Sequence, residues 1–329
     1  MTEVLKSIPR RALMTAAAGL AALASPALAQ PAWPNRTVRV IVPWPPGGAA
    51  DLVARLYTNA MTQRTGQPFV VENRGGATGT IGEAATMQSP ADGYTIMNQS
   101  TPMSVTPALF PGQRYSPAQE FIPVFQTMSV PQLVLVNNDS PARTPAELIA
   151  LMREANGDFP AGSSGIGSLQ HLALELFCRA AGVRANHIPY RGGAPATTDL
   201  IGGQIKLYLG NVNSTATYVR DGALRALAHT AATPRINALP DLPPLSDTLP
   251  GFTTAEWNGV FVRTGTPAPI VAQLSALLNE VVVDPAVVEA LRAGDLTAGP
   301  NTPEQFAAFF TAESTRWQQF VREANIRLE

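Results

Sequence analysis

The chain has 329 residues, of which 23 are Lys or Arg and 24 are Asp or Glu, so its formal net charge is −1. A chain of this length is longer than most domains built on a single hydrophobic core, which favours two domains. The charge balance argues against a nucleic-acid partner, and the single cysteine, Cys178, excludes an intramolecular disulfide.

The first thirty residues have the composition of an export signal. Lys6, Arg10 and Arg11 precede the apolar stretch "ALMTAAAGLAALASPALA", which ends in Ala-Leu-Ala before Gln30. We therefore predict a cleavable signal peptide over residues 1–29 and a mature chain in the bacterial periplasm. The arginine pair leaves both the ordinary Sec route and the twin-arginine Tat route open. No later segment approaches the roughly 20 apolar residues of a membrane span.

Strand and helix patterns alternate along the first part of the mature chain. Strands are predicted at 37–44, 67–74 and 93–100, and helices at 50–66 and 81–89. This alternation predicts a parallel sheet with helices on both faces. Ligands of such sheets bind beyond the carboxyl ends of the strands.

A second series begins with the strand "QLVLVNNDS" (132–140) and continues to about residue 230. Thr144 is predicted as the N-cap of a helix over 144–155, because Pro and Glu follow it at the positions that favour a helix start. Five prolines between 234 and 250 indicate a surface connection. A strand at 254–263 and three helices close the chain, the helices being predicted at 268–282, 285–293 and 303–324.

We therefore predict an α/β fold of two lobes, each a mainly parallel sheet flanked by helices, with a ligand cleft between them. Lobe 1 is predicted to be discontinuous, over residues 30–127 plus 229–329, and lobe 2 to span residues 128–228.

Four glycine-rich loops stand between predicted strands and helices. In "VPWPPGGAADLVAR" (42–55), Pro45-Pro46 exclude helix, while Gly47 and Gly48 expose backbone N–H groups at a helix start, where an anion could bind. The plainer interpretation is a tight turn in which Asp51 supplies the charge at the start of the helix. Three similar loops follow, "NRGGATGTIG" (73–82), "AGSSGIGSLQH" (161–171) and "YRGGAPATTDLIGG" (190–203). We expect the four loops to form one shared ligand site.

Other kinds of site fit the sequence poorly. "GGATGTIG" lacks the Lys-Ser/Thr of a phosphate-binding loop, and no dinucleotide fingerprint is present. Ser164 is not in a nucleophile elbow, and His171, His187 and His229 show no catalytic arrangement with a Ser and an Asp. His171 and Glu175 lack a third metal ligand. We therefore expect no enzyme activity, no metal and no cofactor.

Some side chains near the loops have two interpretations. Asp199 is either a solvated helix carboxylate or a group that orients the "YRGG" loop or meets an ammonium. Trp44 is either core or the floor of a pocket. Because they lie at strand ends, five further residues are candidates for the distal wall of the cleft: Ser100, Thr101, Tyr190, Asn211 and Asn213.

Several blocks occur together in the order of a known family: "PPGGAADLVAR", "VVENRGGATGTIG", "SPADGYTIM", "GSSGIGSLQHLALELF", "HIPYRGGAPATTDLIGGQI", "LRALAHT" and "WNGVFVRTGTP". From about residue 36 to the C-terminus, the chain resembles the periplasmic solute-binding receptors of tripartite tricarboxylate transporters, often called the Bug family. The resemblance implies a two-lobe receptor of the periplasmic binding protein type (type II). It would act as a monomer, close on a small organic carboxylate and work with membrane subunits of the transporter.

The resemblance also implies ligand-binding positions, held through backbone amides, small hydroxyls and ordered waters. Carried over to this sequence they are Gly47, Gly48 and Asp51; Ala77, Thr78 and Gly79; Ser163, Ser164, Gly165, Gly167 and Ser168; and Arg191, Gly192 and Asp199. The chain departs from the family where Trp44 precedes "PPGG" and where Gly75 follows "ENR". A bulky Trp44 would narrow the pocket or stack on an aromatic ligand.

The leading hypothesis is therefore a carboxylate receptor that delivers its ligand to a transporter. A sensor that signals to a membrane kinase is not distinguished from it by the sequence. An exported hydrolase or isomerase in the same cleft is the alternative from another class.

Overall fold

The computed structural model describes residues 33–110, 112, 115–324 and 326. Residues 33–35 belong to an N-terminal unit, Met1–Asn35, in which the Trp33-Pro34 peptide is cis. The elements described below belong to the second unit, Arg36–Glu329. The signal peptide predicted over residues 1–29 lies outside the described residues.

The first strands form a parallel group, as predicted. They are β1 (Val38–Val42), β2 (Phe69–Asn73) and β3 (Thr95–Ser100), in the order β2-β1-β3. Helix α2 (Ala49–Thr65) joins β1 to β2, and a 3₁₀ turn (Ala77–Gly79) with α3 (Thr80–Met87) joins β2 to β3. Gly66 adopts the left-handed conformation that ends α2, which glycine does at no steric cost.

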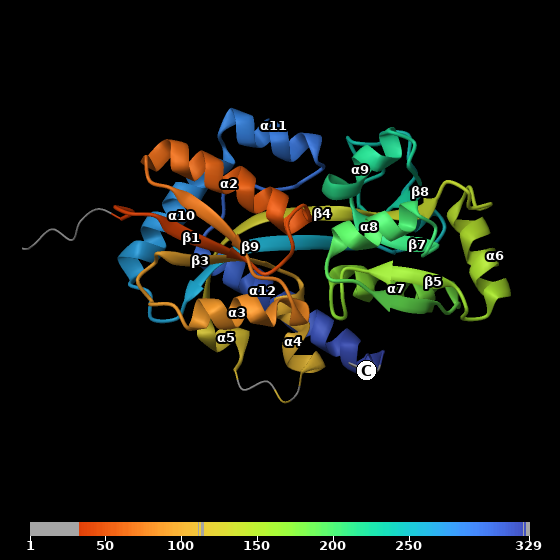
Figure 1. The fold of residues 1–329 in the computed structure, drawn as a ribbon, viewed down its shortest axis with the longest axis horizontal. Helices are drawn as coiled ribbons and strands as arrows, with labels where there is room; N and C mark the ends of the chain where they lie inside the picture. Colours follow the sequence, from red (N-terminus) through yellow and green to blue (C-terminus); the bar gives the residue numbers. More distant parts are fainter. Residues whose placement is uncertain (1–32, 111, 113–114, 325, 327–329) are drawn as a thin grey trace, which may run out of the picture. The chain divides into compact units, whose positions relative to one another are not determined.

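Two long strands run through the middle of the sheet (Figure 1). Strand β9 (Ala255–Arg263) pairs antiparallel with β3 and with the first part of β4 (Phe121–Asn137). From Gln132 onward, β4 pairs antiparallel with β7 (Leu207–Asn211), and from Leu133 also with β8 (Leu224–His229). The strand predicted to begin at 132 therefore begins eleven residues earlier, because its first part has a different neighbour.

The remaining strands, β5 (Pro160–Ser163) and β6 (Asn186–Pro189), extend the sheet beyond β7 in parallel. Within the described residues the order is β2-β1-β3-β9-β4-β7-β5-β6, with β8 paired to β4. The sheet is thus mixed, where the sequence predicted mainly parallel sheets. The difference arises because β4 and β9 run against their neighbours, and strand direction is not encoded in the hydrophobic pattern of a strand.

Most predicted helices and their caps are observed. The helices not yet given are α4 (Pro102–Leu109), α5 (Pro117–Glu120), α6 (Pro145–Ala155), α7 (Leu169–Ala181), α8 (Gly193–Ile201), α9 (Val212–Arg220), α10 (Ala268–Val282), α11 (Pro285–Ala293) and α12 (Pro303–Glu323). Thr144 caps α6 and Thr302 caps α12, each in a reciprocal capping box with the residue three positions on. The predicted surface connection contains one short 3₁₀ turn, Leu245–Asp247.

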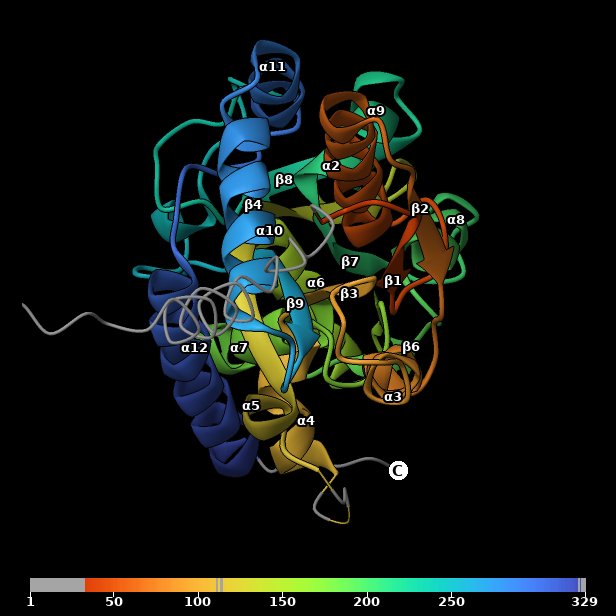
Figure 2. The ribbon, with the colours of Figure 1, turned by 90° about the vertical axis from the view of Figure 1, so that its left-hand side faces the viewer.

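Helices cover both faces of the first half of the sheet. Figure 2 shows α2, α10 and α11 on one side of β1, β3 and β9, and α3, α4, α5 and α12 on the other. On the α12 side, Trp257 and Phe261 of β9 pack with Phe306 and Phe310 of α12. Gly259 lies between those two aromatic residues of β9, and a Cβ at that position would lie 2.0 Å from the Phe306 ring.

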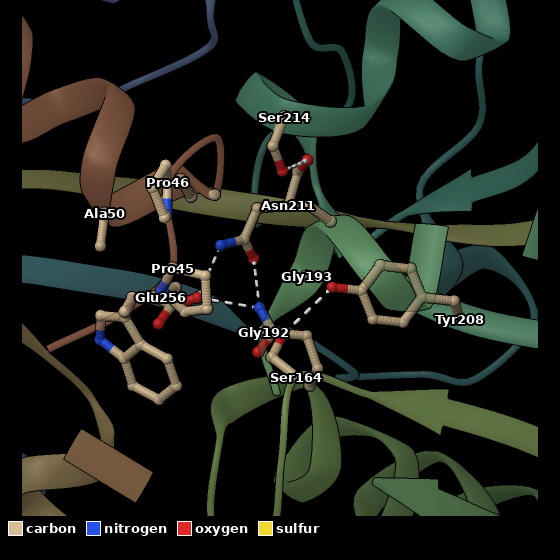
Figure 3. Close-up of a pocket in the computed structure, with 15 residues that line it drawn as sticks. Pro45, Pro46, Ala50, Ser164, Gly192, Gly193, Tyr208, Asn211, Ser214 and Glu256 are labelled. Atoms are coloured by element: carbon tan, nitrogen blue, oxygen red, sulfur yellow. Dashed lines mark hydrogen bonds between the residues drawn. The ribbon is translucent and has the colours of Figure 1, made fainter. Parts of the chain in front are cut away.

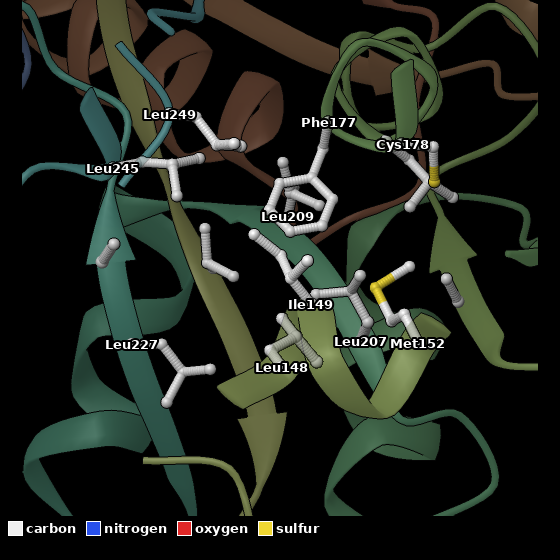
Figure 4. Packing of buried hydrophobic residues seen from close by; sticks show 14 of the residues in the cluster. Leu148, Ile149, Met152, Phe177, Cys178, Leu207, Leu209, Leu227, Leu245 and Leu249 are labelled. Carbon is white, nitrogen blue, oxygen red and sulfur yellow. The ribbon is translucent and has the colours of Figure 1, made fainter. Parts of the chain in front are cut away.

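A separate cluster of buried apolar side chains fills the second half of the fold (Figure 4). Leu148 and Met152 of α6 and Phe177 of α7 pack against Leu207 and Leu209 of β7. The free thiol of Cys178 is buried in the same cluster, where burial raises its pKa to about 12. Each half of the sheet therefore has its own core.

None of the helices described is, by itself, both long and apolar enough to cross a membrane. Helices α10 and α11 reach the length and apolar composition of a membrane span only when they are taken together, and they are bent by 70° at the break between them.

Candidate functional site

A pocket lies where the loop after β1 meets the starts of three helices from the second half of the fold (Figure 3). Its volume is about 40 Å³. The lining residues are Trp44, Pro45, Pro46, Gly48, Ala49, Ala50, Ser164, Gln170, Gly192, Gly193, Ala194, Tyr208, Asn211, Ser214 and Glu256. None of these residues is Lys, Arg or His, so any attraction for an anion must come from backbone and neutral polar groups.

Three of the helices that begin at the pocket lack a side-chain cap. These are α2 after Gly48, α8 after Gly192 and α9 after Asn211. The first N–H groups of a helix have no partner within the helix, and the aligned peptide dipoles place partial positive charge there. Three such ends at one pocket supply backbone donors of the kind that bind carboxylates without a cationic side chain.

The loop after β1 is held in place by a buried carboxylate. Asp51 is 2% exposed and accepts hydrogen bonds from Gly47 N (3.0 Å), Asn73 Nδ2 (2.9 Å) and Arg55 Nε (3.0 Å). Burial raises the pKa of Asp51, but the hydrogen bonds from Arg55, Gly47 and Asn73 outweigh burial, so the pKa lies below its usual value. Gly47 has φ +83°, which glycine adopts without strain. Neither Asp51 nor Gly47 lines the pocket, and their role in ligand binding remains a prediction.

Trp44 lies at the pocket wall, where two hydrogen bonds hold it. Its indole Nε1 donates to Gln99 Oε1 at 3.2 Å, and its backbone carbonyl accepts from Asn73 at 2.9 Å. The interpretation of Trp44 as a pocket residue therefore fits the geometry. Next to it, Pro45 packs against the loop at Gly192, where an added Cβ would lie 3.1 Å from the proline ring.

The second loop does not line the pocket but contacts the third. Ala77 and Thr78 have positive φ, and Thr78 Oγ1 donates to the carbonyl of Ile166 at 2.7 Å. Gly79 begins α3 with φ +94°. The structure therefore places Ala77, Thr78 and Gly79 beside the third loop, and direct ligand contact by them remains a prediction.

The third loop contributes one side chain to the pocket. The Ser164 hydroxyl lies 3.1 Å from the Tyr208 hydroxyl, and the dashed line between them in Figure 3 marks this hydrogen bond. The Ser163 hydroxyl is fully buried and lies 3.2 Å from Gly165 N and 2.6 Å from His187 Nε2. Ser168 caps α7 by accepting from His171 N.

Outside the pocket, the remaining predicted residues have mixed environments. Gly167 N donates to His171 Nδ1 at 3.1 Å. Tyr190 donates to Asp199 Oδ2 at 2.7 Å, so Asp199 orients the "YRGG" loop, one of its two predicted interpretations. Of the predicted residues, Trp44, Gly48, Ser164, Gly192 and Asn211 line the pocket; besides the other residues of the first three loops, the candidates absent from the lining are Arg191, Tyr190, Asp199, Ser100, Thr101 and Asn213.

Glu256 is the acidic residue of the pocket, and sequence reasoning missed it. Its Oε2 accepts from Asn211 Nδ2 at 2.6 Å and from Gln170 Nε2 at 2.9 Å. Burial raises the pKa of Glu256, and the amides of Asn211 and Gln170 with the nearby Ser100 hydroxyl lower it only in part. The available signal was its place in "TAEWNGVFV", where Glu256 and Asn258 put two polar side chains on one face of an otherwise apolar strand.

Beneath the third loop, two histidine rings stack with centroids 4.0 Å apart and an interplanar angle of 7°. Burial lowers the pKa of His171 to about 3, with a further contribution from the charge of His187, and burial lowers the pKa of His187 to about 4. Both rings are therefore neutral in the folded protein at neutral pH.

This pair predicts a loss of stability in acid. The unfolded chain binds protons near pH 6.5 while the folded rings stay neutral, so each histidine lowers the free energy of unfolding by up to about 1.4 kcal/mol per pH unit between pH 6.5 and its folded pKa. Buried Glu83 and Glu256, whose pKa values are raised, act in the opposite direction. The measurement is therefore the difference between wild type and His187→Gln in urea unfolding from pH 7.5 to 4.5. The variant should lose less stability on acidification, and equal losses would contradict the assignment.

In the described part of the chain, no cluster of three or more His, Cys, Asp or Glu residues could hold a metal ion. The fold and the pocket together are those of a solute-binding protein in which loops from two halves of an α/β sheet meet at a pocket.

Comparison with known proteins gives the family. A profile described as "Tripartite tricarboxylate transporter family receptor" matches residues 53–326. The chain is 35% identical over 332 residues to Protein BugT of Bordetella pertussis (strain Tohama I), which covers 100% of this chain and 99% of BugT. The chain belongs to the tripartite tricarboxylate transporter receptor family, as the sequence motifs predicted.

Solved structures agree with this assignment. An R. palustris protein with adipate superposes with a TM-score of 0.86 at 32% identity, over 90% of this chain and 100% of that one. MatC from Rhodopseudomonas palustris with bound malate superposes with a TM-score of 0.82 at 30% identity, over 88% and 100%. The predicted two-lobe α/β fold class is confirmed.

Proposed function

We propose that this receptor captures a small organic carboxylate in the pocket of Figure 3 and delivers it to the membrane subunits of a tripartite tricarboxylate transporter. The observation that carries the proposal is the meeting of three uncapped helix N-termini, those of α2, α8 and α9, at one pocket. The relatives solved with adipate and with malate support a carboxylate as the ligand class.

Binding requires the two halves of the fold to separate. The pocket volume of about 40 Å³ has room for about three water molecules, at roughly 10–15 Å³ each, which is fewer heavy atoms than a dicarboxylate contains. We propose that lobe 1 comprises residues 30–127 plus 229–329 and lobe 2 residues 128–228, and that they close on the ligand. The exchange of β4 partners between Pro131 and Gln132, near this boundary, supports the division.

We further propose that the receptor is a periplasmic monomer, exported through a signal peptide over residues 1–29, and that it is not an enzyme. The Ser163–His187 pair does not favour a hydrolase, because the Ser163 hydroxyl is fully buried, also bonds within its own loop and lies outside the pocket lining. A substrate carbonyl would not reach this hydroxyl.

A ligand screen tests the function. The purified protein, unfolded and refolded to remove carried-over ligand, is heated with mono-, di- and tricarboxylates and with the amide of each. A carboxylate at 100 times its Kd should add about 2.7 kcal/mol to the free energy of unfolding and raise the melting temperature, while its amide should not. Stabilisation by the amides alone would rule out the anion site, and turnover of a stabilising compound would rule out a simple receptor.

A further inference from the structure

Glu256 is a buried acid in a site that the proposed function assigns to an anion. Glu256 lines the pocket, and the residue as a whole is 7% exposed. None of the ion pairs in the described part of the chain includes Glu256. Buried charges in proteins are normally paired, so a carboxylate here without a cation requires an explanation.

The side chains next to Glu256 donate hydrogen bonds to its carboxylate. Asn211 Nδ2 and Gln170 Nε2 both donate to Oε2, and Gln170 Nε2 also donates to Asn211 Oδ1. Asn211 is the N-cap residue of α9, yet its amide is directed to Glu256 and leaves the helix uncapped. The two amides offset part of the cost of burying the ionised carboxylate, and they hold it at the pocket where α2, α8 and α9 begin.

A polar surface continues from Glu256 along one face of the sheet. Residues alternate between faces along β9, so Glu256 and Asn258 lie on the face opposite Trp257 and Gly259, which pack on α12. Asn258 is fully buried, and neither its Oδ1 nor its Nδ2 has a hydrogen-bond partner among the described residues.

The same face leads to the start of α2. In the β3–β9 pairing, Ser100 lies opposite Asn258, and Asn98, two residues before Ser100, donates to the carbonyl of Ala50 in the first turn of α2 at 3.2 Å. The acceptor surface at Glu256 and the helix end proposed for the ligand carboxylate are therefore adjacent.

Another buried glutamate shows what a purely structural acid looks like in this fold. Glu83 is fully buried, but each of its oxygens has its own donor, Gln99 Nε2 at 2.9 Å and the Tyr115 hydroxyl at 2.6 Å, and it does not line the pocket. Glu256 differs because the amides of Asn211 and Gln170 both donate to Oε2 and because a ligand in the pocket would lie against it.

We propose that the ligand carries a cationic nitrogen besides its carboxylate, and that Glu256 is the specificity-determining residue that pairs with it. The inference rests on the proposed function. A carboxylate alone would place two negative groups in one water-poor pocket, whereas an amino carboxylate supplies the missing cation to Glu256 and its anion to the helix ends. Because the two subsites are adjacent, the two charged groups of the ligand are separated by few bonds.

Matched ligand pairs test this. Kd values are measured by calorimetry at pH 7.5 for aspartate and succinate, glutamate and glutarate, alanine and propionate, and phenylalanine and 3-phenylpropionate. In the wild-type protein, the amino member of at least one pair should bind at least about tenfold tighter. Glu256→Gln should weaken that amino member by at least about tenfold and leave its deaminated partner unchanged or tighter. Glu83→Gln, the matched control, should keep the wild-type preference.

The outcomes separate the two proposals. If deaminated acids bind the wild-type protein as tightly as their amino partners, Glu256 does not select a cation, and the inference fails while the proposed function stands. If Glu256→Gln weakens both members of a pair equally, the inference also fails. If no carboxylate of either kind binds, the proposed function fails. Should Glu256→Gln not fold, as judged by circular dichroism, the wild-type comparison alone decides.

Discussion

Replacing Gly192 with alanine should weaken ligand binding by at least about tenfold while the protein stays folded. Gly192 has φ +122° and ψ 172°, a region essentially restricted to glycine, and its new Cβ would lie 3.1 Å from Pro45 Cδ and 3.2 Å from Cγ. Gly192 thus lets the start of α8 pack closely against Pro45, in the loop before α2, at the pocket. Backbone strain of about 1–3 kcal/mol in the closed form alone corresponds to a loss of affinity of about 5- to 150-fold, and the close contacts with Pro45 add to it, so we expect at least about tenfold.

The control for this change is Gly157→Ala. Gly157 also has positive φ (+102°), but the nearest atoms to a Cβ there belong to Arg184 at ordinary contact distances of 3.7 Å and more, and Gly157 is not among the residues that line the pocket. It should cost stability through backbone strain and leave affinity unchanged. Calorimetry with a carboxylate from the screen, together with melting temperatures, measures both. Equal affinity losses in the two variants would show that Gly192 affects the fold rather than closure of the pocket.

Replacing Gly259 with alanine should destabilise the protein by about 3 kcal/mol. The new Cβ would lie 2.0 Å from Cζ and 2.5 Å from Cε1 of Phe306, which is 1% exposed. Neither group moves easily, since Gly259 pairs with both β3 and β4 and Phe306 packs against Trp257 and Phe261. Overpacking of this kind costs about 1–3 kcal/mol and occasionally more, and we expect the upper end.

A double-mutant cycle identifies the cause. Phe306→Ala should cost about 3–5 kcal/mol by leaving a cavity, and Gly259→Ala in that background should cost much less than in the wild type, because the methyl group enters the vacated space. Gly299→Ala, where nothing lies within 4 Å of the new Cβ, should change the free energy of unfolding by less than about 0.5 kcal/mol. Additive costs in urea unfolding would exclude the clash as the mechanism.

Features that depend on neighbouring residues were predictable from the sequence. The capping box at Thr144 was indicated by the Pro and Glu that follow it, and the helix predicted over 50–66 is observed as α2 (Ala49–Thr65). The loop at Gly47 and Gly48 was identified from its prolines and glycines. In each case the signal lies within a few residues of the structure that it specifies.

Features that depend on contacts between distant residues were not predictable. Glu256 acquires its role from Gln170 and Asn211, which are 86 and 45 residues away in the chain. Thr78 and Ile166 are separated by 88 residues, so the contact between the second and third loops has no local signal. The four loops were expected to share a single site, and three of them supply residues to the pocket while the second only contacts the third.

A pocket lined without Lys, Arg or His also has a kinetic consequence. Fixed positive charges draw anions in from a distance, but the partial charge of a helix end acts only within about its first turn. The pocket therefore attracts a carboxylate electrostatically only after the ligand has entered between the halves of the fold. The association rate constant is then set by diffusion and is similar for all small acids, so discrimination between them lies in their dissociation rate constants.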